Sequence, residues 1–300
     1  MGYIIMVKTF SKNELQIAKT LCIGTVFNFN EEQLTVQKVA KPQVSSGECK
    51  TDIYIEASNG HGVTKEFKIS YKQENAQFIE NKMKDSRAES ILGPNWRSII
   101  ESGTRNLKSK FESRAVIIKK SGRGNGSITL GWKYELLDVQ SGELSSKLKL
   151  SKEQIIDIYS GENLPEEKRN AKVDGIEIEN SGVANYMLRT DKLNNPQDII
   201  NNLQTIEEYV EMHPDVYFAC KALNYRTFDK KFDGDRPLAV QIDWENENGF
   251  LVPRYNYSDP LTRKGKEIAQ KLLATLDSLG ITDTNGINST NFLNQELISE

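Results

Sequence analysis

Residues 50–80 read KTDIYIEASNGHGVTKEFKISYKQENAQFIE, and this stretch carries the strongest fold signal in the chain. Apolar and polar side chains alternate on both sides of a patch rich in asparagine and glycine, residues 58–62. Alternation with a period of two around such a break predicts a β-hairpin. One face of the predicted hairpin is apolar. The other face collects acids, lysines and a hydroxyl, namely Asp52, Glu66, Lys68, Ser70 and Lys72.

This polar face resembles the core of the PD-(D/E)xK nuclease superfamily, which includes most type II restriction endonucleases. The signature of that family is an aspartate at the start of one strand and an acid-x-lysine motif on the next. Here Asp52 starts the first strand, and Thr51 stands before it in place of proline. The resemblance covers about thirty of the 300 residues. It implies an α/β (α+β) fold with a mixed central β-sheet flanked by helices.

The resemblance also implies a chemistry, which is the Mg²⁺-dependent hydrolysis of double-stranded DNA by a homodimer. Carboxylates hold the metal ion, whose charge neutralises the reacting phosphate, and a lysine beside them orients or activates water. The residues that the resemblance makes catalytic are Asp52, Ser70, Lys72, Glu66 and Lys68. Those that it makes metal ligands are Asp52, Glu66 and Glu80.

The length of the hairpin loop decides which second-strand residues lie beside Asp52, because residues opposite each other share a face. A two-residue turn puts Asp52 opposite Phe67, on the wrong face. A three- or five-residue loop in which the numbers of paired residues add up to about 120 puts Asp52 opposite Lys68. A loop centred on His61 puts it opposite Ser70. The chemistry therefore predicts a loop longer than a simple Asn-Gly turn.

Two motifs on the second strand satisfy this chemistry. Glu66-Phe67-Lys68 is the literal acid-x-lysine. Ser70-Tyr71-Lys72 is a variant in which serine replaces the acid, and the displaced ligand would then be Glu80 or Asp85. We favour Lys72, because Asp52 opens the first strand and is expected to lie near the end of the second.

Composition excludes several other classes of protein. No apolar run approaches the roughly eighteen residues of a membrane helix, and the apolar part of the N-terminus is too short for a secretory signal. Three scattered cysteines indicate reduced thiols in a cytoplasmic protein rather than a disulfide frame or a zinc site. The two histidines, His61 and His213, are expected in loops, which argues against hydrolases that need a histidine base.

A net charge of -3 does not favour a protein that coats nucleic acid, but it allows a local basic cleft. Residues 101–135 are the most basic part of the chain. A flexible loop rich in glycine and lysine within this part is expected either to contact DNA phosphates or to be a solvated hairpin tip. The predicted DNA contacts are Arg105, Lys119, Lys120 and Arg123.

For the organisation of the chain we predict a catalytic half, residues 1–140, and a second α+β half, residues 141–300, for DNA recognition or dimerisation. A first helix is expected over residues 12–23, with Glu14 on its opening turn. Glu14 is expected to cap this helix rather than to bind metal. Further helices are expected over residues 31–40, 73–84 and 196–212, and a short one over residues 180–189.

The sequence leaves other functions open. A repair, phage or mobile-element nuclease with little sequence specificity needs the same residues. A non-catalytic DNA-binding or scaffold protein needs only a charged hairpin face. The recognition sequence of a restriction enzyme is not readable from these residues, because base readout depends on which side chains reach the groove edges.

Overall fold

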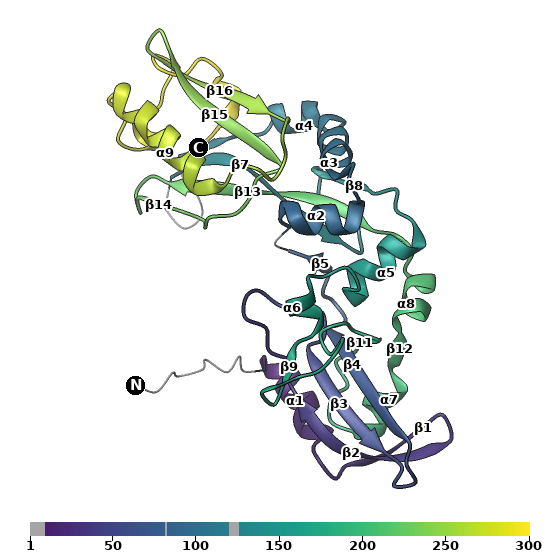
Figure 1. Cartoon of the computed structure of the whole chain (residues 1–300). Helices are drawn as coiled ribbons and strands as arrows, with labels where there is room; N and C mark the ends of the chain where they lie inside the picture. The colour runs from purple at the N-terminus through teal and green to yellow at the C-terminus, as the bar shows by residue number, and fades with distance from the viewer. Residues whose placement is uncertain (1–9, 82, 120–125) are drawn as a thin grey trace. The chain divides into compact units, whose positions relative to one another are not determined.

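The computed structural model describes residues 10–81, 83–119 and 126–300 (Figure 1). The predicted α/β fold class is confirmed, since helices and β-sheets occur in both compact units of the chain. Unit 1 consists of Met1–Gln77 and Leu150–Pro214, and unit 2 of Phe78–Lys149 and Asp215–Glu300. Each unit thus combines two separated segments, whereas the prediction divided the chain once, near residue 140. The difference arises because residues after 150 return to the first hairpin and pair with it.

Unit 1 is built on a six-stranded mixed sheet with the order β1-β2-β3-β4-β11-β12. Its strands are β1 (Val26–Phe29), β2 (Glu32–Ala40), β3 (Ile53–Ser58), β4 (Thr64–Lys72), β11 (Tyr186–Arg189) and β12 (Leu203–Thr205). Only the β4–β11 pair is parallel, which requires a long connection between the two strands. The helices of unit 1 are α1 (Lys12–Thr20), α5 (Lys152–Ser160), α6 (Glu166–Arg169), α7 (Pro196–Asn201) and α8 (Ile206–Met212). A separate small hairpin joins β9 (Lys172–Val173) to β10 (Ile176–Glu177).

The predicted hairpin is confirmed as β3 and β4, which run antiparallel (Figure 1). Ile53 pairs with Ile69 and Ser58 with Thr64, which is the register of the loop centred on His61. The side chain of Asn59 holds this loop, because its Oδ1 accepts hydrogen bonds from the backbone N–H groups of His61 and Val63.

The two faces of this sheet differ as the alternation predicts. Odd-numbered residues of β3 and β4, such as Ile55 and Phe67, belong to the main hydrophobic core with Ile17 and Leu21 of α1. The opposite face is polar along β4. At Tyr54, however, it is fully buried, because Ala40 and Val173 cover that ring. The second face is therefore only partly open to solvent.

Three helices expected from the sequence are wrong. Residues 31–40 form β2 instead, because Asn30 and Glu31 take positive φ angles and make a hairpin turn. In place of the helix expected over residues 73–84, the chain forms a turn and β5 (Phe78–Glu80) within residues 73–81, and β5 pairs with a long strand of unit 2. A short helix considered for residues 180–189 is a loop and β11. Gly182 lies in that loop where a Cβ would be 1.9 Å from the carbonyl oxygen of Lys168.

Unit 2 is organised around β7 (Ser127–Leu137), which pairs along its length with β13 (Tyr217–Arg226). Its other strands are β5, β6 (Ile117–Ile118), β8 (Ser145–Lys147), β14 (Lys231–Phe232), β15 (Val240–Glu247), β16 (Phe250–Asn256) and β17 (Ile298–Ser299). Its helices are α2 (Asp85–Leu92), α3 (Trp96–Arg105), α4 (Lys108–Glu112) and α9 (Gly265–Ser278), with 3₁₀ turns at Thr284–Gly286 and Gln295–Leu297. Gly131 is needed in β7, because a Cβ there would be 2.3 Å from the carbonyl oxygen of Val240.

Within the described ranges, none of the helices has the length and apolar character that crossing a bilayer demands.

Candidate functional site

Asp52, the first predicted metal ligand, lies directly before β3 and is fixed to β4 by two hydrogen bonds. Its backbone N–H donates to the carbonyl oxygen of Ile69 at 2.8 Å. Its Oδ2 accepts a hydrogen bond from the backbone N–H of Tyr71, also at 2.8 Å. Tyr71 is the middle residue of the Ser70-Tyr71-Lys72 motif. The carboxylate is therefore bonded directly to the variant motif.

The hairpin ladder shifts at Asp52. Ile69 pairs with Ile53 and also accepts the N–H of Asp52, so that two residues of the first strand face one residue of the second. This is the pattern of a β-bulge, which re-aims the side chain of the extra residue. The register of the ladder alone would place Asp52 opposite Ser70, and the bulge modifies that expectation locally.

A second carboxylate, Glu14 on α1, lies in the neighbourhood of Asp52. Its Oε2 accepts a hydrogen bond from the backbone N–H of Ser11 at 2.9 Å, so the predicted cap is confirmed. The same carboxylate forms an ion pair with Lys41, and only 13% of the Glu14 side chain is exposed. Glu14 thus combines the capping role with a place beside Asp52.

The groups around Asp52 raise its pKa. Burial raises the pKa of Asp52 to about 7, and the hydrogen bond from Tyr71 opposes the rise. The negative charge of Glu14 raises the pKa further, while the ammonium groups of Lys41 and Lys50 lower it. A carboxyl with this pKa is only partly ionised at neutral pH. A divalent cation beside it would favour the ionised form.

Ser70 and Lys72 lie on the central strand β4, between β3 and β11. The Ser70 side chain is buried, and Lys72 pairs in register with Arg189 of β11. The Lys72 Nζ lies 5.6 Å from the centre of the Tyr159 ring on α5, a distance at which a cation interacts with an aromatic face. The backbone of the motif is therefore held on both sides.

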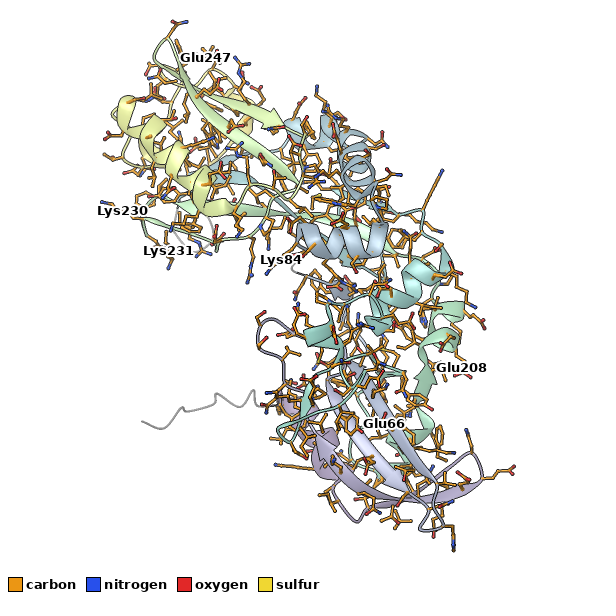
Figure 2. The ribbon with its side chains drawn as sticks, in the orientation of Figure 1. Glu66, Lys84, Glu208, Lys230, Lys231 and Glu247 are labelled. Atoms are coloured by element: carbon orange, nitrogen blue, oxygen red, sulfur yellow. The ribbon has the colours of Figure 1, made fainter. Side chains whose placement is uncertain are left out.

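The literal motif lies elsewhere on the hairpin. Glu66, which projects from β4 in Figure 2, pairs with Glu56, about 13 Å along the strand from Asp52. Its carboxylate accepts a hydrogen bond from the hydroxyl of the buried Tyr54. Lys68 pairs with Tyr54, and its backbone N–H donates to Oδ1 of Asn185 at 2.8 Å. The structure does not bring this motif to Asp52.

The two acids considered as displaced ligands belong to unit 2. The Oε1 of Glu80 accepts a hydrogen bond from Nε of Arg87 at 3.0 Å. Asp85 begins α2 and accepts a hydrogen bond from the backbone N–H of Ser86. Each of these carboxylates thus has a local role in unit 2.

The basic side chains predicted to contact DNA already have acidic neighbours. Arg105 donates to Glu101 at 2.8 Å and to the hydroxyl of Ser258 at 3.1 Å. Lys119 forms an ion pair with Glu300 at 3.1 Å. The other two predicted contacts, which are Lys120 and Arg123, lie outside the described residues. Any phosphate that binds Arg105 or Lys119 has to compete with a carboxylate.

No three histidine, cysteine, aspartate or glutamate side chains of the described chain are grouped as a metal site. Glu14 and Asp52 are close enough for the negative charge of Glu14 to raise the pKa of Asp52. Mg²⁺ in proteins that act on phosphates is commonly held by one or two carboxylates, with phosphate and water oxygens as the other ligands. The Glu14 carboxylate is already engaged by the backbone N–H of Ser11 and by the ammonium group of Lys41.

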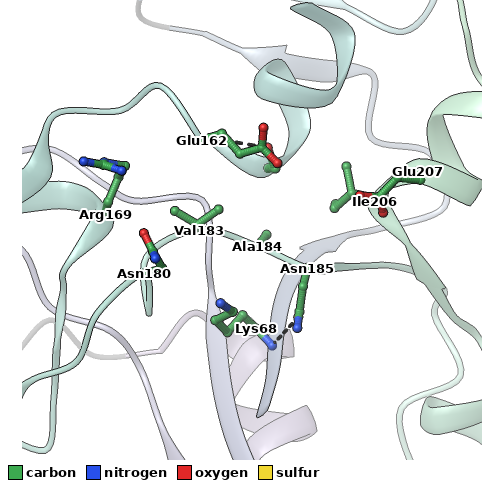
Figure 3. Close-up of a pocket in the computed structure, with 10 residues that line it drawn as sticks. Lys68, Glu162, Arg169, Asn180, Val183, Ala184, Asn185, Ile206 and Glu207 are labelled. Carbon is green, nitrogen blue, oxygen red and sulfur yellow. Dashed lines mark hydrogen bonds between the residues drawn. The ribbon is translucent and has the colours of Figure 1, made fainter. Parts of the chain in front are cut away.

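A cavity of about 370 Å³ lies in unit 1 beside Lys68. Figure 3 shows Arg169 and Asn180 on one side of it and Glu207 on the other, with Glu162 above and Lys68 below. Burial raises the pKa of Glu162, and the carboxylates of Asp157 and Glu207 raise it further. Opposite charges thus line different walls of one cavity.

Sequence reasoning missed Lys41 and Lys50 beside Asp52, and it missed the cavity. No short-range pattern marks these residues. The cavity forms because residues 183–185 lead into β11, which pairs with β4 far away in the sequence. Only Lys68 among its lining residues belongs to the hairpin that carried the original signal.

Comparison with known proteins finds no match to this chain among protein-family models, curated proteins or solved structures.

Proposed function

We propose that this protein is a Mg²⁺-dependent DNA endonuclease with Asp52 and the Ser70-Tyr71-Lys72 motif at its active site. The observation that carries the proposal is the hydrogen bond from the Tyr71 N–H to the Asp52 carboxylate. It fixes an aspartate at the start of one strand to a polar-x-lysine motif at the end of the next, as the resemblance to the PD-(D/E)xK nucleases requires.

The residues present fit a magnesium ion. Asp52 is a half-buried carboxylate whose pKa is raised to about 7, and Glu14 adds a second negative charge beside it. Two oxygen ligands of like charge in a partly desolvated place are stabilised by a hard divalent cation. When bound, the ion would supply the charge that neutralises the phosphate under attack.

The protein's own groups would then position the reaction. Asp52 would hold the ion, kept in place by the fixed backbone of β4. Glu14 would join it as a second ligand only after its carboxylate releases Lys41. Lys72 would donate hydrogen bonds to a phosphate oxygen or to the attacking water, for which it first has to leave the face of Tyr159. Ser70 would supply a neutral hydroxyl where the literal motif has an acid.

The type of endonuclease that we propose is a type II restriction enzyme acting as a homodimer, since cutting both strands of a symmetric site needs two active sites. Incubation with plasmid DNA tests the proposal. Discrete fragments that appear with Mg²⁺ and disappear with EDTA are expected from the wild type, and none from Asp52→Asn. Lys65→Ala, on β4 like the motif but ion-paired with Glu32 at 2.7 Å, is the control and is expected to cut normally.

The other outcomes of this experiment decide between the alternatives. A smear in place of fragments would identify a nuclease without sequence specificity. Intact plasmid under all conditions, from protein shown to be folded by circular dichroism, would overturn the nuclease proposal and favour a binding protein.

A further inference from the structure

The cavity beside Lys68 has a distribution of charge that points to a ligand. Among the described residues, neither the Lys68 ammonium nor the Arg169 guanidinium has a hydrogen-bond or ion-pair partner. The same holds within the described chain for the carboxylates of Glu162 and Glu207. None of these four charged side chains thus has a hydrogen bond or ion pair within the described chain; Lys68 and Arg169 are half-buried, whereas Glu162 and Glu207 are exposed to solvent. Those of opposite sign occupy different walls of the cavity (Figure 3).

Such an arrangement fits a molecule with an anionic group at one end and hydrogen-bond donors at the other. Lysine and arginine are the side chains that bind phosphate most strongly. Carboxylates accept hydrogen bonds from the amino groups of nucleobases, as glutamate and aspartate do from cytosine N4. Val183 and Ile206 supply apolar surface in the same cavity, which suits the faces of a base.

The size of the cavity agrees with this class of ligand. Its volume of about 370 Å³ lies within the range of roughly 300–1,000 Å³ that is usual for small-molecule pockets. Asn185 gives it a rigid floor, because its side chain is bonded both to the N–H of Lys68 and to the carbonyl oxygen of Glu66.

We propose that this cavity binds a single nucleotide whose base carries an exocyclic amine, with its phosphate on Lys68 and Arg169 and its base edge on Glu162 and Glu207. The nucleotide can come from solution or be extruded from a DNA strand. Binding of a strand-borne nucleotide rests on the proposed function, since it requires DNA to lie on this unit. Binding of a free nucleotide does not.

Calorimetric titration of the full chain in EDTA tests the site with dCMP, dAMP, dGMP and dTMP. The three nucleotides with an amine are expected to bind, and dTMP at least about tenfold more weakly, which is the loss of one charge-assisted hydrogen bond. Equal binding of all four, or binding of none, would overturn the proposal. Tighter binding of a zwitterionic amino acid such as glutamine would overturn it as well.

Variants of the cavity test which residue binds the phosphate and which binds the base of the ligand. Arg169→Gln is expected to weaken dCMP about tenfold while leaving deoxycytidine, which lacks the phosphate, unchanged. Glu207→Gln is expected to weaken both ligands. Lys172→Gln, an exposed residue outside the cavity, is the control and should change neither. Equal losses for dCMP and deoxycytidine in Arg169→Gln would contradict the assignment of the phosphate.

The source of the nucleotide is tested with duplex DNA that contains 2-aminopurine, in Ca²⁺ so that the duplex is not cut. A rise in fluorescence that Glu207→Gln abolishes would assign a base extruded from the strand. Binding of free nucleotides without that rise would assign the nucleotide from solution. Plasmid cleavage without any nucleotide binding would contradict only the proposed nucleotide site. Nucleotide binding without cleavage would contradict only the proposed nuclease function.

Discussion

The carboxylate of Asp52 accepts a hydrogen bond of 2.8 Å from the backbone N–H of Tyr71, at the open end of the central hairpin, where β3 begins and β4 ends. This bond links the acid before β3 to the Ser70-Tyr71-Lys72 segment of β4. Because it uses a backbone donor, it persists whatever conformation the side chains of Ser70 and Lys72 adopt. It selects the variant motif over Glu66-Phe67-Lys68 as the neighbour of Asp52.

Asp52→Asn is expected to stabilise the protein at alkaline pH. The pKa of Asp52 is raised from 3.8 to about 7 in the fold, so its contribution to stability is complete below about pH 4 and is lost between pH 4 and 7. Asparagine keeps the acceptor for the Tyr71 N–H but carries no charge. Urea unfolding should therefore show a gain of roughly 1–3 kcal/mol for the variant at pH 8.5.

The same comparison at low pH is the control for that prediction. At pH 4 both side chains are neutral in the fold, and the difference between the two proteins should be small. A variant that is less stable than the wild type at pH 8.5 would show that the Asp52 carboxylate is stabilised, not penalised, by its surroundings.

Divalent metal is expected to offset the free-energy cost of ionising the Asp52 carboxyl in the folded wild type at alkaline pH. A ligand that binds only the folded state at one hundred times its dissociation constant stabilises it by about 2.7 kcal/mol. Thermal unfolding at pH 8 should therefore shift upward with Mg²⁺ or Ca²⁺ in the wild type and not in Asp52→Asn. An equal shift in both proteins would place the metal elsewhere.

Glu14 and Lys41 are expected to move the pKa of Asp52 in opposite directions. Glu14→Gln removes a negative neighbour and keeps the capping-box pattern, so the pKa of Asp52 should fall. Lys41→Gln removes a positive neighbour, so the pKa should rise. Carbon NMR of the Asp52 carboxyl across a pH series measures both. Shifts of the same sign would show that the substitutions act through the fold.

Tyr54→Phe tests whether Glu66 has a structural role. The variant removes the hydroxyl that donates to the Glu66 carboxylate. The loss of one hydrogen bond should cost about 0.5–1.5 kcal/mol of unfolding free energy. Plasmid cleavage should remain at the wild-type rate, because the hydrogen bonds described for Asp52 go to Ile69 and Tyr71 and not to either of these residues. Loss of cleavage in a folded variant would show that Glu66 takes part in the active site.

Local patterns predicted the hairpin and its apolar face, because the alternation from Ile53 to Lys72 reflects direct burial on one side. They failed where distant pairing decides the structure. Residues 186–189 have no strong strand pattern of their own, and they extend because β4 offers them an unpaired edge. The bulge at Asp52 could not be predicted either, since it depends on how the two strand ends meet. Lys50 precedes Asp52 by two residues and Lys41 directly follows β2, but neither belongs to a motif that marks a metal site.

Expected helices failed for a related reason. Residues 31–40 have helix-compatible composition, but the turn at Asn30 and Glu31 lets them pair as a strand on both sides. For residues 196–212, one long amphipathic helix was predicted. The chain instead forms α7, the short strand β12 and α8, and the side chain of Thr205 caps α8 with Glu208.

The most direct test of the central claim compares single-turnover cleavage by Lys72→Ala and Lys68→Ala, with enzyme in excess over plasmid. If the Ser70-Tyr71-Lys72 motif performs the chemistry, Lys72→Ala should slow the cleavage step by at least about a hundredfold, and Lys68→Ala should slow it far less. The reverse order, with Lys68→Ala inactive and Lys72→Ala close to the wild-type rate, would contradict the account.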